Sequence, residues 1–331
     1  MIAIFHPPGE NELTGGYLYN KRIAGEIPFA EVVAVPPAEL CEALARAASR
    51  HTRLVVDSLY IDDDTDLGAM SERGAIALIH HLPSLDPGFS ASRLRDQKAR
   101  ERAFLRAARG AIATSAFMAR LLGERGLAKD PAVCPPGVDD AFFDAAPGRA
   151  AEPPELITVA NLEPRKGYLE HLEPIGALAK RCDFLWHIVG ATHDRAYARR
   201  VEARAAEVGL RERVRFHGRL GRDELLSLLG RASAHVLLSR FESYGMVVAE
   251  SLAAGVPVVA PRIGEIATLV DHDATGLLAE PGDPDDLAGK LERVVSDPAL
   301  RARLCREATA RRGERLRWPD AAQQFARALG A

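Results

Sequence analysis

The chain has 331 residues, of which 47% are hydrophobic and 27% are charged, and its formal net charge is −3 with the histidines neutral. One hydrophobic core rarely serves so many residues, so the length predicts two domains, and the composition is typical of a globular protein. The slightly negative charge argues against nucleic acid as a partner, because it provides no overall basic field.

The cysteine spacing and the N-terminal sequence bear on the cellular compartment in which we expect the protein. Cys41, Cys134, Cys182 and Cys305 are far apart and form no CxxC pair, so we expect neither a disulfide framework nor a zinc site. The opening stretch MIAIFHPPGE has a short apolar run with no basic residues before it, unlike a signal peptide. No segment approaches the roughly 18 consecutive apolar residues of a membrane-spanning helix. These observations predict a cytoplasmic protein.

Short, mostly apolar runs recur along the chain with helical patterns between them. In the first part they cover residues 2–5, 30–35, 53–60, 75–82 and 110–115. In the second part they cover residues 155–162, 184–190, 213–220, 234–239 and 256–261. Most lack polar alternation, as strands buried on both faces of a parallel sheet do. Strands that alternate with helices predict doubly wound α/β domains.

Residues 144–155, DAAPGRAAEPPE, interrupt this series with an Ala-, Pro- and Gly-rich stretch that has no periodicity. We interpret it as a linker between a first domain, 1–146, and a second, 152–317, with the ligand in a cleft between them. A last helix within 318–331 carries an apolar stripe. It either completes the second domain or crosses back onto the first.

Two candidate ligand-binding features lie in the first domain. Gly15 and Gly16, in LTGGYLYN after the first strand, let the backbone approach a ligand at a helix start, although the full GxGxxG fingerprint is absent. His80 and His81 end a buried strand, and one of them facing the cleft can donate to a sugar hydroxyl or a phosphate. A structural histidine bonded to backbone is an equally good interpretation. The HH pair does not have the HExxH spacing of a metal site.

Two charged segments of the first domain are better explained as surface features than as functional sites. The acidic run IDDDTD, residues 61–66, follows a strand and is better explained as a loop or helix cap than as a metal site. Seven basic residues lie between Arg93 and Arg109 on a helical pattern. Such a helix can dock on an anionic membrane, but a solvated surface is the favoured interpretation.

The stretch TVANLEPRKGYLEHL, residues 158–172, places Arg165 and Lys166 between a strand and a helix. Ligands of open α/β sheets bind at this place, and helix N-termini attract anions. Arginine grips a phosphate with a planar fork and lysine adds a point charge. Taken alone, the pair is better explained as a solvated loop.

The stretch FESYGMVVAE, residues 241–250, carries Glu242 before a helix and Glu250 within it. We expect the helix from about Gly245 to Ala254, with backbone N–H groups of Tyr244, Gly245 and Met246 at its start. Glu250 stands among apolar residues, where an unpaired carboxylate is costly, so a ligand role is favoured. Glu242 is equally consistent with a favourable charge near a helix N-terminus.

Together with VCPPGVDDAFF, NLEPRKG, FHGRL, ESYGMVVAESLAAGVPVVA and TGLLAEPGDPDDLA, these features resemble the family 4 retaining glycosyltransferases, which have the GT-B fold. The resemblance covers nearly the whole chain and is strongest from Leu156 to Arg303. It implies two Rossmann-like domains facing across a cleft, with the last helix crossing back to the first.

The resemblance also implies roles. Arg165 and Lys166 would hold the donor diphosphate, Glu242 the donor hexose and Glu250 the ribose hydroxyls. Backbone around Ser243, Tyr244, Gly245 and Met246 would touch sugar or phosphate. Arg219 and Leu220 would lie against the base, and Gly15, Gly16 and His80 would come from the first domain. By register, the family histidine aligns with His80 better than with His81. No metal or other cofactor is implied.

The implied activity is transfer of a hexosyl unit from a nucleotide-diphosphate sugar, most simply a UDP-sugar, with retention. The short first domain favours a small soluble acceptor, whose identity stays open. A transferase acting on a lipid-linked or polysaccharide acceptor at a membrane surface, and a non-catalytic sugar-nucleotide-binding protein, are the alternatives. A retaining glycosidase is disfavoured, because it needs two carboxylates about 5.5 Å apart.

Overall fold

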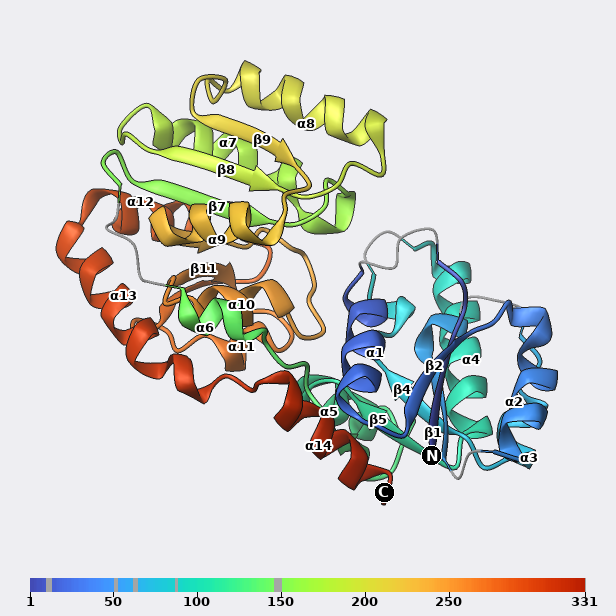
Figure 1. The fold of residues 1–331 in the computed structure, drawn as a ribbon. Coiled ribbons are helices and arrows are strands. Elements are labelled where there is room, and N and C mark those ends of the chain that lie inside the picture. Colours follow the sequence, from blue (N-terminus) through green and yellow to red (C-terminus); the bar gives the residue numbers. More distant parts are fainter. Residues whose placement is uncertain (10–13, 51–52, 62–64, 87–88, 146–150, 331) are drawn as a thin grey trace. The chain divides into compact units, whose positions relative to one another are not determined.

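The computed structural model describes residues 1–9, 14–50, 53–61, 65–86, 89–145 and 151–330. The chain divides into two compact units, Met1–Gly137 with Leu316–Ala331, and Val138–Arg315. Each unit contains a parallel sheet of six strands with helices on its faces (Figure 1). These sheets confirm the predicted pair of doubly wound α/β domains.

The sheet of the first unit has the strand order β2-β1-β3-β4-β5-β6. Its strands are β1 (Ile2–His6), β2 (Ala30–Ala34), β3 (Arg53–Asp57), β4 (Ile76–Ile79), β5 (Gly110–Ala113) and β6 (Ala132–Val133). Its helices are α1 (Gly15–Glu26), α2 (Leu40–Ala48), α3 (Gly68–Glu72), α4 (Ala91–Ala107), α5 (Ala116–Glu124) and α14 (Trp318–Ala328). Short 3₁₀ turns cover Pro37–Glu39, Ser58–Tyr60 and Pro83–Leu85.

Alternate strand residues face opposite sides of this sheet. Phe5, Val56 and Ile79 pack with side chains of α2 to α5, such as Leu44 and Phe104, in one buried cluster. Buried neighbours such as Ile4 and Val55 point to the other face, against which α1 packs. Burial on both faces explains why these strands lack polar alternation.

The C-terminal helix α14 belongs to the first unit, so the interpretation that it crosses back is confirmed. In Figure 1 it is drawn in dark red, among the blue and green elements of that unit. The ring of Tyr19 on α1 meets the rings of Trp318 and Phe325 edge to face, at centroid distances of 6.1 Å and 6.2 Å. A side chain at Gly137 would lie 2.4 Å from the amide nitrogen of Trp318, so a glycine is needed where the two chain segments cross.

The sheet of the second unit has the order β12-β11-β10-β7-β8-β9. Its strands are β7 (Glu155–Val159), β8 (Leu185–Val189), β9 (Val214–Gly218), β10 (Ala232–Val236), β11 (Val258–Pro261) and β12 (Gly276–Ala279). Its longer helices are α7 (Tyr168–Ala179), α8 (Arg195–Glu207), α9 (Arg222–Arg231), α10 (Met246–Ala253), α12 (Pro284–Ser296) and α13 (Pro298–Arg311). Its short elements are α6 (Asp140–Asp144), α11 (Ile266–Leu269) and the 3₁₀ turns Pro164–Lys166 and Arg312–Glu314.

Two sets of helices cover this sheet. Side chains of α7, α8 and α12 pack with Trp186 and Ile188 in one cluster. Side chains of α6, α9 and α10 pack with Ile157 and Val189 in another. Phe142 and Phe143 of α6 are buried in that second cluster, which explains why the division between the units falls at Gly137 rather than within the expected linker.

Sequence analysis missed two strands, both at the edge of a sheet. β6 has only two residues, too few for a recognisable pattern, whereas β12 (GLLA) is as long as the predicted strands β4, β5 and β11 but was not singled out as a strand. Among the described residues, no helix is both long enough and apolar enough to cross a membrane.

Candidate functional site

The carboxyl ends of β7 and β10 meet where the strand order of the second sheet reverses. The chain passes from β7 to β8 and β9 on one side and then places β10 on the other side of β7. Ligands of open α/β sheets bind at such a point, because the loops leaving the two strands diverge. Arg165 and Lys166 follow β7, and Glu242 follows β10, so three predicted site residues gather here.

An ion pair joins these two loops. Nζ of Lys166 lies 2.5 Å from Oε1 of Glu242, and both side chains are only 12% exposed. The hydroxyl of Ser239 donates to the same oxygen at 2.7 Å. The N–H of Arg240 donates to the carbonyl of Arg165 at 3.1 Å, which ties the two loops through the backbone as well. Sequence analysis missed Ser239, whose only signal was a hydroxyl at the end of a buried run.

The carboxylate of Glu242 is held in its charged form. Burial has the largest effect on its pKa and raises it, but the charge and hydrogen bond of Lys166, with help from Arg165 and Ser239, bring the pKa below its ordinary value. An ammonium group has three N–H donors, so Lys166 can hold Glu242 and still bind a ligand anion. Nε of Arg165 lies 2.7 Å from Oε1 of Glu163, and the Arg165 side chain is 45% exposed, within reach of a ligand.

Two glycines allow neighbouring loops of the site to approach one another closely, Gly167 in the loop after β7 and Gly264 in the loop after β11. Gly167 has φ 70°, and a Cβ there would lie 2.2 Å from the carbonyl oxygen of Leu238. Gly264 has φ 48°, and a Cβ there would lie 1.7 Å from the carbonyl oxygen of Glu242. Left-handed backbone and lack of space both demand glycine. Sequence analysis assigned no role to Gly264, because its contact with Glu242 is visible only in the folded chain.

Helix α10 begins directly after the Glu242 loop. Its N-cap is Gly245, with φ 94°, where a Cβ would lie 2.4 Å from Cδ1 of Ile266. The first N–H groups of a helix have no partner within it, so the end at Met246 carries the positive end of the helix dipole. Ser243 and Tyr244 are half-buried before it, and Glu250 is half-buried within it.

Arg219 and Leu220 follow β9 at the same edge of the sheet, two strands away from β7. Arg219 is exposed, and Leu220 packs against the cluster that contains Leu228 and Leu229. The structure therefore sets these two residues apart from the ion pair, with β8 between them.

His235, in the middle of the second sheet, was missed by sequence analysis. It lies on β10, is fully buried, and Nε2 accepts from the N–H of Val159 at 3.4 Å. Burial, the largest effect, lowers the pKa of His235 to about 4, although the charge of Glu242 raises it and that of Lys166 lowers it further. The imidazole beside the ion pair is therefore neutral at neutral pH.

Substitution of His235 by Asn is expected to reduce the acid sensitivity of folding. The unfolded chain binds a proton at this side chain near its ordinary pKa of 6.5, whereas the folded chain binds it only near pH 4. Between these values the unfolded state holds more protons, so the free energy of unfolding decreases as the pH falls. The decrease from His235 is about 3 kcal/mol over the window, at about 1.4 kcal/mol per pKa unit.

Urea unfolding of the parent protein and of His235→Asn across that pH range measures this difference. The exposed His193 offers a control, because His193→Asn makes the same chemical change at a histidine that is not buried. Equal pH dependence in the parent protein and His235→Asn would contradict the assignment.

The predicted residues of the first unit gather at its own reversal point, between β1 and β3. Gly15 and Gly16 open α1, and a Cβ at Gly16 would lie 3.2 Å from Cδ2 of His80. Nε2 of His80 lies 3.1 Å from Oδ2 of the buried Asp57, whereas Nε2 of His81 lies 3.1 Å from Oδ1 of Asp86. The structure thus brings His80 beside Gly16 and gives His81 a separate partner.

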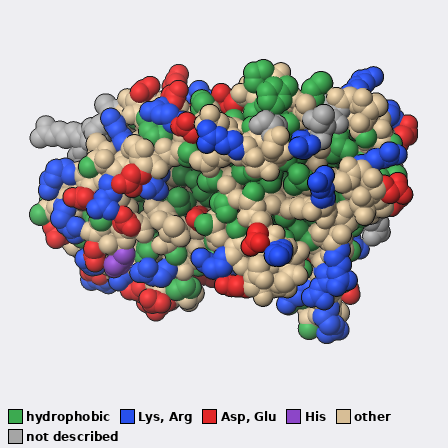
Figure 2. All heavy atoms as spheres, turned by 90° about the horizontal axis from the view of Figure 1, so that it is seen from below, with side chains coloured by type: hydrophobic (Ala, Val, Ile, Leu, Met, Phe, Trp, Pro, Cys, Tyr) green, Lys and Arg blue, Asp and Glu red, His purple; other side chains and the backbone are tan. Residues whose placement is uncertain are grey.

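The acidic run cannot be placed in full, because residues 62–64 lie outside the described part of the chain. Among the described residues, no group of three or more His, Cys, Asp or Glu side chains is arranged to hold a metal ion. The seven basic side chains between Arg93 and Arg109 are exposed, while Glu101 and Phe104 on the same segment are buried. The face drawn in Figure 2 carries both acidic and basic side chains, with hydrophobic and uncharged atoms over much of its middle.

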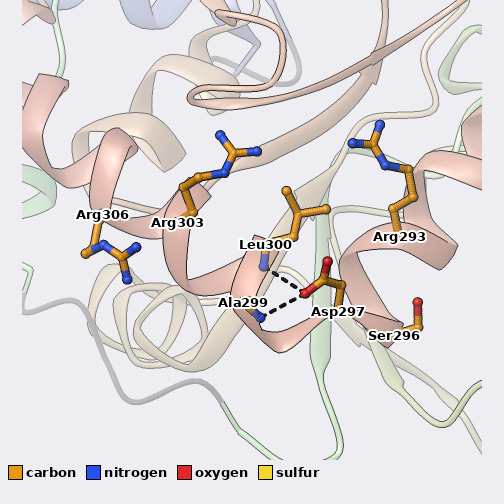
Figure 3. Close-up of a pocket in the computed structure, with 7 residues that line it drawn as sticks. All are labelled: Arg293, Ser296, Asp297, Ala299, Leu300, Arg303 and Arg306. Atoms are coloured by element: carbon orange, nitrogen blue, oxygen red, sulfur yellow. Dashed lines mark hydrogen bonds between the residues drawn. The ribbon is translucent and has the colours of Figure 1, made fainter.

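A hollow of about 690 Å³ lies along α12 and α13, away from the predicted residues. Figure 3 shows its lining: Arg293, Ser296, Asp297, Ala299, Leu300, Arg303 and Arg306. The start of α13 does not offer its N–H groups to an anion, because Asp297 accepts from Ala299 and Leu300 at 2.9 Å and 3.0 Å. Arg293 lies 3.1 Å from Asp273, whose carbonyl accepts from Arg303. We therefore do not take this hollow as the functional site.

Comparison with known proteins defines the class. Residues 139–311, just over half of the chain, match the model of the family described as glycosyl transferases group 1. The chain belongs to this family, and its two sheets with the returning C-terminal helix form the GT-B fold.

Two curated relatives illustrate the sequence similarity. One is a D-inositol 3-phosphate glycosyltransferase of Acidothermus cellulolyticus, 34% identical over 54% of this chain and 43% of the relative. The other is a glycogen synthase of Mycobacterium tuberculosis, 39% identical over 33% of this chain and 26% of the relative. The matched region thus spans less than half of the length of either relative.

Two solved structures share the fold along almost the whole chain. Sucrose-phosphate synthase from Thermosynechococcus elongatus superimposes with a TM-score of 0.78 at 20% identity, covering 98% of this chain and 97% of that one. Anabaena Alr3699/HepE, solved in complex with UDP and glucose, gives a TM-score of 0.75 at 19% identity and covers 99% of both chains. At 20% and 19% identity, these similarities establish a shared fold and nothing about the activity of this chain.

Proposed function

We propose that this protein is a retaining glycosyltransferase that moves a hexosyl unit from a nucleoside diphosphate sugar, in the first place a UDP-sugar, to an acceptor hydroxyl without a metal ion. The observation that carries the proposal is the Lys166–Glu242 ion pair at the reversal point of the second sheet, 2.5 Å apart and mostly buried. Membership of the group 1 glycosyl transferases supports it, as does the UDP bound by the Anabaena protein of the same fold.

The charges suit departure of a diphosphate. Cleavage of an anomeric C–O bond builds positive charge on the sugar and negative charge on the leaving group. Lys166, Arg165 and the N-terminus of α10 would stabilise that negative charge, and a preorganised site needs little rearrangement to do so. Glu242 would bind hydroxyls of the hexose while it keeps Lys166 in place. The inferred retention rests on the resemblance to family 4, not on the geometry.

The other predicted residues would hold the rest of the donor. Glu250 would bind the ribose hydroxyls, and Arg219 with Leu220 would contact the base. Backbone at Ser243, Tyr244, Gly245 and Met246 would touch the sugar or the phosphates. Gly15, Gly16 and His80 of the first unit would contact the sugar that is transferred.

The proposal is tested by incubating the purified protein with UDP-, GDP- and ADP-sugars in the presence of a chelator. Binding is measured as a rise in melting temperature, because a ligand of the native state stabilises it by mass action. Turnover is measured as released nucleoside diphosphate, with soluble sugars, inositol phosphates, glucans and lipid-linked sugars as acceptors. Binding without any turnover would favour a sugar-nucleotide-binding protein. Absence of binding by all three donor classes would overturn the proposal.

The role of Glu250 predicts a discrimination between two nucleotides. Glu250→Ala should weaken UDP binding by roughly 10- to 100-fold, because a hydrogen bond to a charged group contributes about 1.5–3 kcal/mol. The same substitution should cost less with 2′-deoxy-UDP, which lacks one of the hydroxyls in question. Calorimetric titration of the parent protein and Glu250→Ala, each with UDP and with 2′-deoxy-UDP, gives the four affinities of a double-mutant cycle. An equal loss for the two nucleotides would rule out contact with the 2′-hydroxyl.

A further inference from the structure

A buried polar network in the first unit holds His80. Asp57, at the end of β3, and Asn20, on α1, are both 0% exposed. Oδ2 of Asp57 accepts from Nδ2 of Asn20 at 2.5 Å and lies 3.1 Å from Nε2 of His80. Oδ1 of Asn20 lies 3.2 Å from the same ring nitrogen. The function proposed above gives neither Asp57 nor Asn20 a role.

The network determines which ring nitrogen carries the proton. Burial has the largest effect on the pKa of Asp57 and raises it. The charge that His80 carries when protonated, and the hydrogen bonds from His80, Asn20 and the N–H of Leu59, bring the pKa below its ordinary value. The ionised carboxylate only accepts hydrogen bonds, so Asn20 must turn its NH₂ group toward Asp57 and its carbonyl oxygen toward His80. Both groups that face Nε2 are therefore acceptors, and Nε2 must be the donor.

The surroundings also fix the orientation of the ring. Tyr19 meets it edge to face, with the ring centroids 5.0 Å apart, and the Tyr19 hydroxyl is anchored on the carbonyl of Cys134 at 2.9 Å. The backbone N–H of His80 donates to Oγ of Ser58 at 3.1 Å. A half-turn of the ring would put a carbon atom where Nε2 now meets Asp57 and Asn20, and both hydrogen bonds would be lost.

We propose that Asp57 and Asn20 are positioning residues, which keep His80 in the tautomer protonated on Nε2 so that Nδ1 accepts a hydrogen bond from a hydroxyl group of the sugar substrate. Nδ1 forms no hydrogen bond within the described part of the chain, and the His80 side chain is 12% exposed. In the neutral ring, Nδ1 offers a lone pair. This acceptor favours a ligand hydroxyl, which can donate a hydrogen bond, over a dianionic phosphate or a carboxylate, which have no proton to donate. This inference rests on the proposed glycosyl transfer for the identity of the ligand.

Asp57→Asn tests the inference, since the new amide can donate to Nε2 and reverse the tautomer, as an Asp-to-Asn change beside a histidine does in the serine-protease triad. We expect ¹⁵N NMR of the neutral ring to show Nε2–H in the parent and Nδ1–H in the variant. We expect kcat to fall about 100-fold, the upper end of the range for partners that orient a histidine bound to a metal ion. The affinity for UDP should change less than twofold, because the diphosphate contacts proposed above lie in the second unit. Asn20→Ala, which leaves Asp57 in place, should keep the parent tautomer and lose less of kcat.

His81 provides a matched control. Its Nε2 also lies 3.1 Å from a carboxylate oxygen, Oδ1 of Asp86, but the two side chains are 31% and 37% exposed. Asp86→Asn makes the same chemical change beside it and should leave transfer unaltered.

The NMR measurement does not depend on activity. A parent His80 ring protonated on Nδ1 would overturn the inference even if the protein transfers sugar, and it needs no folded Asp57→Asn variant. An unchanged kcat in Asp57→Asn with the tautomer reversed would overturn it as well. A parent that transfers no sugar would count against the proposed function and the hydroxyl ligand, while the tautomer would still be measured.

Discussion

Lys166→Ala is expected to lower the rate of sugar transfer by about a thousandfold or more, comparable to the loss of a preorganised donor in an oxyanion-type site. The reason is that Lys166 combines two tasks. It holds Glu242 at 2.5 Å and, in the proposed mechanism, neutralises charge on the departing diphosphate. The measurement is the initial rate of nucleoside diphosphate release at saturating donor, together with the affinity for UDP.

Loss of activity in this variant has to be separated from loss of structure. Without Lys166 the Glu242 carboxylate, 12% exposed, loses its cation, and an unpaired buried charge is destabilising. The double variant Lys166→Ala with Glu242→Gln removes that charge, so stability should recover while transfer stays abolished. Lys180→Ala, at the exposed end of α7, is the control and should behave like the parent. Recovery of transfer in the double variant would show that Lys166 acts only through the fold.

The elements that sequence analysis predicted well are those with a local signal. Ten apolar runs coincide with ten strands, and the glycines around α1 and α10 mark the helix starts. Lys166 and Glu242 could be named because their motifs are local, although they lie 76 positions apart in the chain. The resemblance to a known family, rather than any spacing, led to the expectation that both lie in one site.

What sequence analysis missed depends on contacts between distant segments. Asn20 and Asp57 are ordinary residues in ordinary runs, and only the sheet order β1-β3-β4 brings them to His80. His235 looks like any polar residue in a strand until its complete burial is known. The apolar stripe of the last helix left both of its interpretations open, and only the family resemblance favoured a return to the first domain, because Tyr19, its aromatic partner, lies at the other end of the chain. Such partners leave no periodic trace in a single sequence.

Gly264→Ala is expected to disrupt the site from outside the predicted motifs. A Cβ at this position would lie 1.7 Å from the carbonyl oxygen of Glu242, a distance at which one of the two loops must move. The backbone φ of 48° adds strain, roughly 1 kcal/mol for alanine in the left-handed region. We expect a loss of about 3 kcal/mol or more of unfolding free energy, typical of strained or overpacked substitutions, and a loss of transfer because Glu242 and Lys166 separate.

Gly209→Ala separates the clash from the strain. Gly209 has φ 84° but no atom within 4 Å of a Cβ built there, so alanine is strained without meeting a neighbour. It should lower the unfolding free energy by only about 1 kcal/mol and leave transfer unchanged. Urea unfolding and initial rates of the parent and the two variants give the comparison. If Gly264→Ala instead matched Gly209→Ala in both the unfolding free energy and the initial rate, the loop that carries Glu242 would be able to move away without cost. The close contact with Gly264 would then not be needed to position the Lys166–Glu242 ion pair. If Gly264→Ala lowered the unfolding free energy without loss of transfer, the Glu242 carboxylate would keep its position although its backbone had moved. Ser239 and Lys166 would then be sufficient to position that carboxylate.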